Sequence, residues 1–427
     1  MLASRPLSCL PFSTLARSYI ITAVSSYPLL LRPSLFVLTF LAHATSPIFN
    51  PDRNPVLRYA LKKTFYAQFC AGETADEVHK TIAGLKRMGY KGVILGHAKE
   101  VVLTEEEVDG LDASKDTAEQ ARANAADIAL WKQNTVDTIA LADQDDFVAL
   151  KFTGAGGQAL QRLKATVACA PEFEAAVHEI CRRAQDKGVR LLFDAEQASL
   201  QQGIDNWTMY FAKIYNKGEK AVVYGTYQAY AKRTPKILAQ HLEQARKENF
   251  VLGVKLVRGA YMGSDPRELF WPTIDGTHHC YNGLAQCLIG RRFGGILVPV
   301  EGASSQFPRV DLVLASHNAE TVRLARQLRD LQVRNGEPRI EMAYAQLMGM
   351  ADNVSCELVQ AARERAASGR RDGEVPNAYK YLVWGRMSEC MKYLLRRAQE
   401  NRDAVMRTVD ARRALGQELG SRMRLFK

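Results

Sequence analysis

The stretch LGVKLVRGAY, residues 252–261, decides the fold, because it combines a buried strand with the polar segment that follows the strand. Within it, residues 252–257 are apolar apart from Lys255, and a short apolar run of this kind is typical of a buried parallel strand. A helical pattern over residues 234–247 comes before the strand, and another near Tyr281 comes after it. The stretch is therefore one unit of a βα repeat.

The same alternation of a short strand and a helix occurs eight times along the chain. The predicted strands are residues 92–96, 147–152, 190–194, 221–226, 252–257, 310–315, 340–344 and 378–383. Eight βα units predict an α/β protein with a (β/α)8 TIM-type barrel. An open doubly wound sheet is the alternative, but it should show G-x-G-x-x-G after its first strand. The only candidate, Gly154-Ala-Gly-Gly157, fits a tight strand-to-helix turn instead.

The composition is that of a basic globular protein. The 427 residues carry a net charge of +11, with 47% hydrophobic and 24% charged residues. Basicity suits an anionic membrane surface, an acidic ligand or nucleic acid, but no aromatic-basic interleaving supports nucleic acid. The eight cysteines form no C-x-x-C pair, so we expect reduced thiols. The run His278-His279-Cys280 has no matching cluster, so we expect no metal site.

The first 51 residues differ from the rest of the chain. They contain arginine and serine but no acidic residue, which suits a mitochondrial targeting region; a secretory signal is the alternative. Arg32 and two prolines interrupt the apolar runs, so we expect two short helices that lie on a membrane or pack on the main domain. The expected organisation is a targeting and apolar helical segment at 1–51, a helical arm at 52–91, the barrel at 92–410 and a basic tail at 411–427.

Polar side chains gather where the predicted strands end. A barrel has its active site at the carboxyl ends of its strands. Taken singly, each residue has an ordinary structural explanation, such as a helix cap or a solvated charge. Together they predict a binding site for something large and anionic. These residues are Glu100, Lys151, Asp194, Glu196, Tyr227, Gln228, Tyr230, Lys255, Arg258, Ser316, His317, Asn318, Tyr344, Gln346, Tyr379 and Tyr381.

The stretch YLLRRAQEN, residues 393–401, places Tyr393, Arg396, Arg397 and Glu400 on one face of a helix. One interpretation is a solvated face with an Arg396–Glu400 pair. The other is a fork of guanidinium groups that binds a carboxylate or a phosphate.

Six stretches in order along the chain resemble the proline dehydrogenase family, and most of all its fungal mitochondrial members. They are FDAE (193–196), YQAY (227–230), VKLVRGAY (254–261), ASHN (315–318), QLMGMAD (346–352) and YLLRRAQEN (393–401). The resemblance covers roughly residues 55–405. It implies a distorted (β/α)8 barrel with noncovalent FAD that oxidises L-proline to 1-pyrroline-5-carboxylate, the first step of proline catabolism. It also implies ubiquinone as acceptor and a peripheral position on the matrix side of the mitochondrial inner membrane.

The resemblance also assigns roles to individual residues. Arg396 and Arg397 would bind the proline carboxylate, with Tyr381, Tyr393 and Leu347 packed over the ring. Lys151, Asp194 and Arg258 would be catalytic, with Asp194 orienting Lys151 or an arginine through an ion pair. FAD would be bound by Gln228, Lys255, Arg258, Gly259, Ala260, Tyr261, His317, Asn318 and Glu400.

Two features depart from the family pattern. Residues 96–100 read GHAKE where the family has an Asp-Tyr-like pair, and residues 293–307 form an inserted loop. A hydroxyproline dehydrogenase is one alternative, but Tyr381 stands where such enzymes have a smaller residue. A methylenetetrahydrofolate reductase type of flavin barrel would lack the paired arginines. A barrel without activity is the third alternative.

Overall fold

The computed structural model describes residues 5–44, 46–98, 118–369, 372–391, 393–395 and 405–425. Eight parallel strands form a closed barrel in the order β1 to β8, which confirms the predicted fold class. The predicted strands agree with the observed ones to within three residues at either end. The strands are β1 (Gly92–His97), β2 (Phe147–Leu150), β3 (Arg190–Phe193), β4 (Val223–Gln228), β5 (Leu252–Val257), β6 (Val310–Ala315), β7 (Met342–Leu347) and β8 (Ala378–Trp384).

Helices separate these strands along the chain. The helical arm predicted at 52–91 contains α3, α4 and α5, with a π-helical turn at Lys62–Tyr66 between α3 and α4, and the sequence did not predict α8. The α-helices are α1 (Phe12–Ser26), α2 (Pro28–His43), α3 (Pro55–Leu61), α4 (Ala67–Phe69), α5 (Ala75–Arg87), α7 (Ala118–Leu141), α8 (Gly157–Lys164), α9 (Pro171–Lys187), α10 (Ala198–Tyr215), α11 (Thr234–Glu248), α12 (Ile274–Gly290), α13 (Ala319–Arg334), α14 (Asp352–Ser368) and α16 (Val405–Leu425). Short 3-10 turns occur at Pro6–Cys9, Phe152–Ala155 and Arg267–Leu269.

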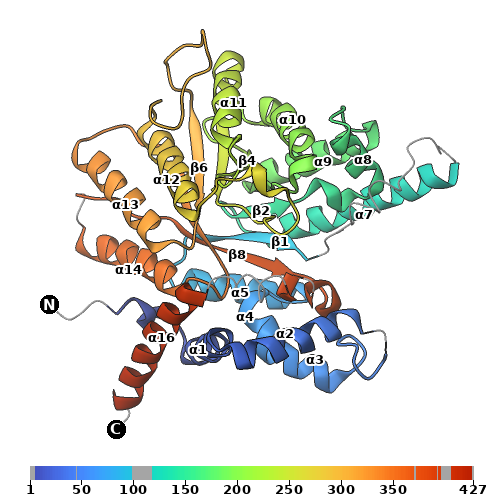
Figure 1. The fold of residues 1–427 in the computed structure, drawn as a ribbon, viewed down its shortest axis with the longest axis vertical. Helices are drawn as coiled ribbons and strands as arrows, with labels where there is room; N and C mark the ends of the chain where they lie inside the picture. The colour runs from blue at the N-terminus through green and yellow to red at the C-terminus, as the bar shows by residue number, and fades with distance from the viewer. Residues whose placement is uncertain are drawn as a thin grey trace. The chain divides into compact units, whose positions relative to one another are not determined.

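The chain divides into two compact units. The first contains the described residues of 1–99, 346–369 and 375–427, and the second contains those of 100–345 and 370–374. In the second unit, parallel pairing runs from β2 to the start of β7, with Thr226 opposite Lys255 and Val313 opposite Ala343. Figure 1 shows α9, α10 and α11 as an outer layer over these strands. Five aromatic side chains pack between strands and helices there: Phe152, Phe173, Phe193, Trp207 and Phe211.

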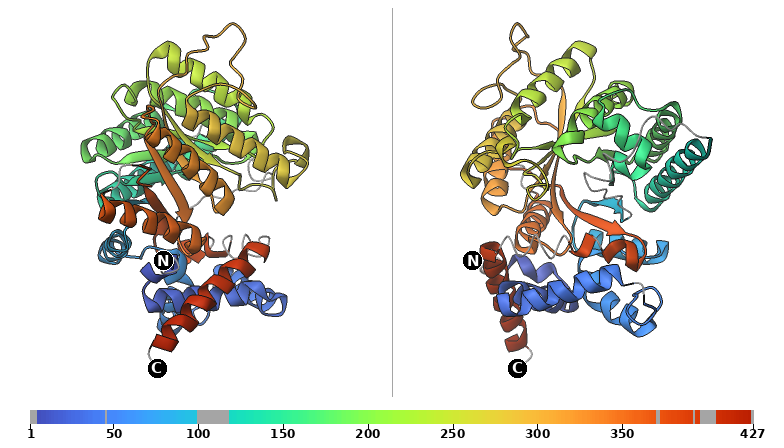
Figure 2. Two further views of the ribbon diagram at one scale, coloured as in Figure 1. Left: turned by 90° about the vertical axis from the view of Figure 1, so that its left-hand side faces the viewer. Right: turned by 45° about the vertical axis from the view of Figure 1, so that its right-hand side comes forward.

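The first unit combines segments from both ends of the chain. Strands β1 and β8 pair in parallel, with Gly92 opposite Tyr379 and Ile94 opposite Tyr381. Helix α5 buries Val78, Ile82 and Leu85, which follow helical spacing. Helices α1 and α16 lie side by side, as both views in Figure 2 show. Both termini therefore contribute to the core of this unit.

Among the described residues, no single helix has the length and hydropathy needed to cross a bilayer. Helices α1 and α2 pass that test only when they are taken together, and the chain bends by 103° between them.

Candidate active site

A buried ion pair joins the end of β3 to β5 in the second unit. Lys255 Nζ lies 2.5 Å from Asp194 Oδ1, and the two side chains are 9% and 12% exposed. Asp194 directly follows β3, and Lys255 lies inside β5 between the buried residues Val254 and Leu256. A buried charge needs a partner, so each side chain holds the other in the folded protein. The sequence predicted both residues for the site, but it did not predict this pairing.

Glu196 fixes the turn that follows Lys151. Its carboxylate accepts hydrogen bonds from Thr153 Oγ1 at 2.5 Å and from Thr153 N at 3.3 Å. Burial raises the pKa of Glu196, while the charge of Lys151 and the bonds from Thr153 act in the opposite direction. Trp131 Nε1 donates to the carbonyl of Lys151 at 3.0 Å, so the backbone at Lys151 is held from both sides.

Glu196 follows the third predicted strand, but the sequence assigns it no individual role. The signal that could have assigned it is the spacing in FDAE, which puts both carboxylates on one face of an extended segment. The structure separates their functions. Asp194 pairs with Lys255, whereas Glu196 binds the turn after β2.

The guanidinium of Arg258 is anchored on three elements that follow β5 and β6. Nε donates to His278 Nδ1 at 3.1 Å, Nη1 to Ser316 Oγ at 2.7 Å and Nη2 to Thr321 Oγ1 at 2.8 Å. Its carbon Cζ also lies 4.4 Å from the centre of the Tyr281 ring. Arg258 therefore fixes the loops at the carboxyl ends of β5 and β6, and His278 takes part in this network.

Gln228 connects the ends of β3 and β5. Its Nε2 donates to the Glu196 carbonyl at 3.1 Å, and its Oε1 accepts from Ala260 N at 3.3 Å. Gly259 has φ +144°, and a Cβ there would lie 2.0 Å from the Tyr230 ring. Only glycine therefore permits this close approach. The structure brings Gln228 and Ala260 together next to Gly259, and all three are residues that the resemblance assigned to the cofactor.

His317 and Asn318 follow β6. Asn318 Oδ1 accepts from Thr321 N at 2.9 Å and so caps α13, while Asn318 N donates to Ser316 Oγ at 3.1 Å. The capping explains the position of Asn318 without a ligand. The segment nevertheless lies against Arg258, because Ser316 and Thr321 also bind that side chain.

The substrate residues predicted for the first unit fall partly within the described residues. Tyr393 is 4% exposed and belongs to an apolar cluster against which the half-buried Tyr381 packs. The carbonyl of Tyr381 accepts from Met348 N at 2.9 Å, next to Leu347. Arg396, Arg397 and Glu400 lie outside the described residues, as does Glu100.

Lys380 stabilises the turn that follows Leu347. It is 2% exposed, and its Nζ donates to the carbonyl of Leu347 at 3.3 Å, to that of Met350 at 2.9 Å and to Asp352 Oδ1 at 2.9 Å. The sequence placed Lys380 in the last strand but gave it no role. A lysine between Tyr379 and Tyr381 in a buried strand is the signal that could have marked it.

Asp205 lines a cavity of about 490 Å³ in the second unit, together with Gln201, Tyr227 and Tyr230. Its carboxylate accepts from Gln201 Nε2 at 2.8 Å. Burial raises the pKa of Asp205 from the ordinary value of 3.8 to about 6. The folded state therefore binds this proton more tightly than the unfolded state, and this residue makes stability fall as the pH rises from about 4 to about 6.

Asp205→Asn is expected to raise the free energy of unfolding at pH 7 by roughly 1–3 kcal/mol, because the charge is removed and the acceptor for Gln201 remains. Urea unfolding of both proteins from pH 4 to pH 7 would measure the difference, which should grow with pH. His241, whose pKa burial lowers to about 4, acts with the opposite sign in both proteins, so its contribution cancels in the difference. A difference that does not change with pH would contradict the assignment.

A closed barrel with a buried ion pair between the end of β3 and β5 is typical of an enzyme of the (β/α)8 class. The sequence profile of the family described as Proline dehydrogenase matches residues 78–409. The chain therefore belongs to the proline dehydrogenase family and is an oxidoreductase of that family. This confirms the resemblance seen in the sequence.

Individual relatives agree with this assignment. Proline dehydrogenase 1, mitochondrial, of Arabidopsis thaliana is 29% identical over 85% of this chain and 75% of its own length. The probable mitochondrial proline dehydrogenase of Schizosaccharomyces pombe is 28% identical over 87% of this chain and 81% of its own. Among solved structures, proline utilization A from Bdellovibrio bacteriovorus superposes with a TM-score of 0.63 at 15% identity. That match covers 91% of this chain but only 41% of the solved one, and it supports the fold alone.

Proposed function

We propose that the protein is an FAD-dependent proline dehydrogenase that oxidises L-proline to 1-pyrroline-5-carboxylate and passes the electrons to ubiquinone. Family membership supports the substrate. The observation on which the proposal mainly rests is the buried Asp194–Lys255 pair at the strand ends, in two of the stretches that match the family. A buried ion pair is costly to desolvate, and such groups gather at functional sites.

The donors at the ends of β4, β5 and β6 fit FAD. Gly259 lets the 259–261 loop run close to Tyr230, and Gln228 holds this loop through Ala260 N. Lys255 and Arg258 add positive charge near a ligand that carries phosphates. We assign Tyr261, His317, Asn318 and Glu400 to the same cofactor. When bound, FAD would supply the acceptor for the hydride.

For the substrate we assign Arg396 and Arg397 to the carboxylate, because planar guanidinium groups bind a carboxylate through paired hydrogen bonds. Tyr381, Tyr393 and Leu347 would pack against the ring. The apolar cluster around Tyr393 supports this assignment, since it provides a dry surface for a small apolar ring.

The amine of proline must react in its neutral form, because a protonated amine has no lone pair to assist hydride departure. We assign Lys151 and Arg258 to charge stabilisation during the reaction. Asp194 holds Lys255 in place, and Glu196 positions the turn after Lys151 through Thr153. The positive charges of Lys151 and Arg258 would lower the pKa of the bound amine.

We place the protein in the mitochondrion, on the matrix side of the inner membrane, as a peripheral protein. The names of its relatives from Arabidopsis and fission yeast support the organelle. The acid-free N-terminal segment supports it as well.

The proposal is tested with the full chain, reconstituted with FAD and kept without oxygen. L-proline is expected to bleach the visible flavin absorption. Arg396→Met should need about 10- to 100-fold more proline for the same bleaching, because a charged hydrogen-bond partner of the carboxylate is lost. The exposed Arg183, which is 61% exposed in α9, provides a matched control as Arg183→Met.

Three outcomes would change the assignment. Bleaching by hydroxyproline and not by proline would make the protein a hydroxyproline dehydrogenase, against which Tyr381 argues. A protein that binds no FAD would leave a barrel without this activity. An equal effect of Arg396→Met and Arg183→Met would remove Arg396 from the substrate site.

A further inference from the structure

Helix α2 is apolar on its outward face as well as on its buried face. Leu31 and Leu38 are 6% and 3% exposed, whereas Leu29 and Phe36 on the other side are 89% and 74% exposed. A surface helix in water normally turns polar residues outward. An outward face of this composition therefore indicates a second, apolar partner.

The hydroxyl groups on α2 are bonded within the helix. Ser34 Oγ donates to the carbonyl of Leu30, and Thr39 Oγ1 donates to that of Leu35, both at 2.8 Å. These exposed donors are thus satisfied without water. Hydroxyl groups bonded in this way are compatible with a helix face that contacts lipid.

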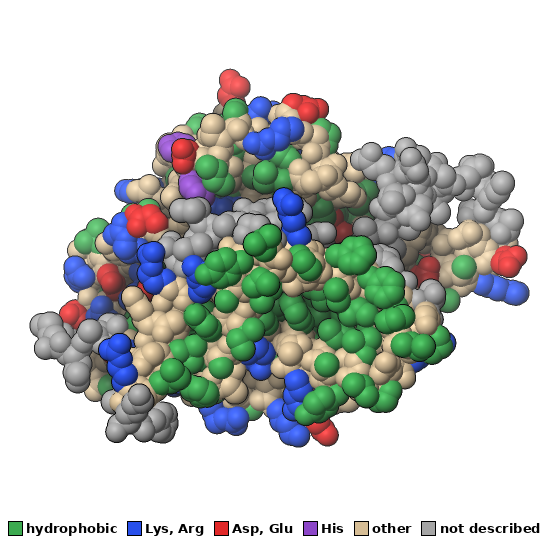
Figure 3. Space-filling view, turned by 60° about the horizontal axis from the view of Figure 1, so that its bottom comes forward, with side chains coloured by type: hydrophobic (Ala, Val, Ile, Leu, Met, Phe, Trp, Pro, Cys, Tyr) green, Lys and Arg blue, Asp and Glu red, His purple; other side chains and the backbone are tan. Residues whose placement is uncertain are grey.

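The outward apolar surface continues over neighbouring elements of the first unit. We call Ile20, Tyr27, Leu29, Phe36, Phe40 and Tyr59, which are 49% to 89% exposed, the apolar face. Figure 3 shows hydrophobic side chains gathered on this side of the molecule, with Lys and Arg among them. Aromatic side chains with basic neighbours are typical of proteins that bind at the membrane interface.

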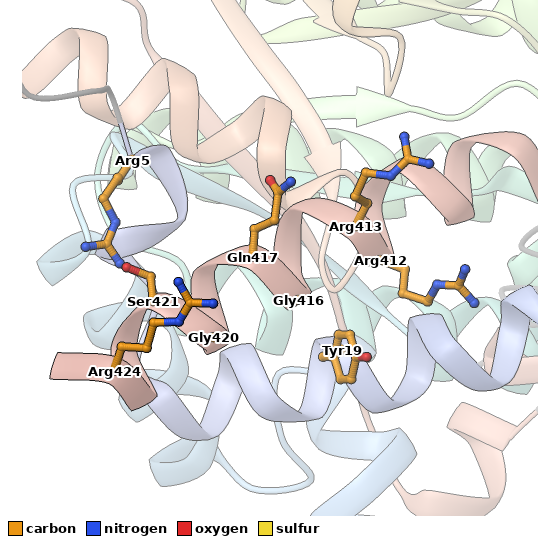
Figure 4. Close-up of a pocket in the computed structure, with 9 residues that line it drawn as sticks. All are labelled: Arg5, Tyr19, Arg412, Arg413, Gly416, Gln417, Gly420, Ser421 and Arg424. Atoms are coloured by element: carbon orange, nitrogen blue, oxygen red, sulfur yellow. The ribbon is translucent and has the colours of Figure 1, made fainter. Parts of the chain in front are cut away.

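An arginine-rich groove of about 780 Å³ lies along α16 in the first unit (Figure 4). It is lined by Arg412, Arg413 and Arg424 of α16, with Arg5 and Tyr19 on the opposite side. The guanidinium of Arg412 lies 4.8 Å from the ring of Tyr27, which links the groove to the apolar face. Its Nη1 is buried and has no hydrogen-bond partner among the described residues. An anionic oxygen would supply the hydrogen-bond acceptor that Nη1 of Arg412 lacks.

The other side of the same helices is part of the core. Ile21, Leu38 and Leu41 are at most 8% exposed and share a cluster with Tyr66 and Phe69. Removal of the first 51 residues would expose that cluster to water. The lost burial would cost folding free energy on the scale of the net stability of a domain. Helices α1 and α2 therefore belong to the folded protein.

We propose that the apolar face and the arginine-rich groove dock the protein flat on a bilayer that contains anionic lipids, with a lipid phosphate in the groove. Residues 5–51 contain no acidic side chain to oppose such a surface. The bend of 103° between α1 and α2 suits helices that lie in the plane of the interface. The inference rests on the proposed function only for the identity of the membrane.

The test measures binding of the full chain to sedimenting vesicles, without proline or acceptor. Equimolar phosphatidylcholine and phosphatidylglycerol vesicles should bind the protein, and pure phosphatidylcholine vesicles should bind it at least tenfold less. Leu29→Glu with Phe36→Glu is expected to lower binding about tenfold or more, because both exposed side chains lose their place in the lipid. Arg413→Gln with Arg424→Gln should lower binding only to the anionic vesicles.

Val298→Glu with Leu331→Glu provides a matched control, since these side chains are 63% and 49% exposed in the second unit. Circular dichroism melting curves verify that all variants fold. Unchanged vesicle binding by the α2 variant would overturn the proposal. The proposal would also be overturned if the wild type were a dimer and the α2 variant a monomer that still binds vesicles. The apolar face would then be a contact between two copies. Because no turnover is measured, either outcome leaves the proposed activity untouched.

Discussion

Asp194→Asn is expected to lower the free energy of unfolding by about 3–5 kcal/mol and to abolish oxidation of proline. The variant would leave Lys255 charged and buried, with a side chain that is only 9% exposed. Removing one partner of a buried pair costs more than the pair itself contributes, because the remaining charge stays buried after this counterion is lost. Urea unfolding followed by tryptophan fluorescence measures the stability.

The double variant Asp194→Asn with Lys255→Met separates stability from chemistry. It removes both charges, so most of the lost stability should return, while the reaction with proline should stay absent. If the single variant were as stable as the wild type, the pair would be solvated and the site would be open to water. If the double variant oxidised proline at the normal rate, neither charge would take part in the reaction.

Lys380→Met is expected to have a similar effect in the first unit, about 3–5 kcal/mol, because Asp352 would lose its buried partner. The carbonyls of Leu347 and Met350 would lose a donor as well. The turn that they hold includes Ala351 at φ +51°, a conformation that a non-glycine residue adopts only when its surroundings impose it. We therefore also expect a higher KM for proline, through displacement of Leu347.

Asp352→Asn is the control for Lys380→Met. It preserves the bonds from Lys380 to the two carbonyls and should raise KM less than Lys380→Met does. Chemical unfolding and a proline titration on the same preparations check both effects. An unchanged KM in Lys380→Met, together with reduced stability, would restrict Lys380 to a structural role.

The strands were predictable because each is a short apolar run buried on both faces. Residues 252–257 and 310–315 were predicted to the residue for that reason. Helix α8 was not predicted because it is only eight residues long and begins at Gly157, within the glycine-rich run that was interpreted as a strand-to-helix turn. Its buried residues Ala159, Leu160 and Leu163 do follow helical spacing.

The site was predictable as a set of residues but not as a set of contacts. The sequence could place Asp194 and Lys255 at strand ends, yet their pairing spans 61 residues and depends on strand order in the barrel. The network of Arg258 with Ser316 and Thr321 spans 58 and 63 residues. No local pattern encodes such contacts, because they arise only when the strands are brought side by side.

The two units differ in how their chain segments are distributed, and this sets an order for folding during synthesis. The described part of the second unit is almost one continuous stretch, residues 118–345, and can assemble as soon as it has left the ribosome. The first unit needs both termini, since Arg5 pairs with Glu418 across 413 residues of chain. Until the last helix has been made, α1 and α2 have no completed core to cover. Newly made chains would therefore expose these apolar helices from the start of synthesis to its end, and a chaperone or an early membrane contact would have to shield them.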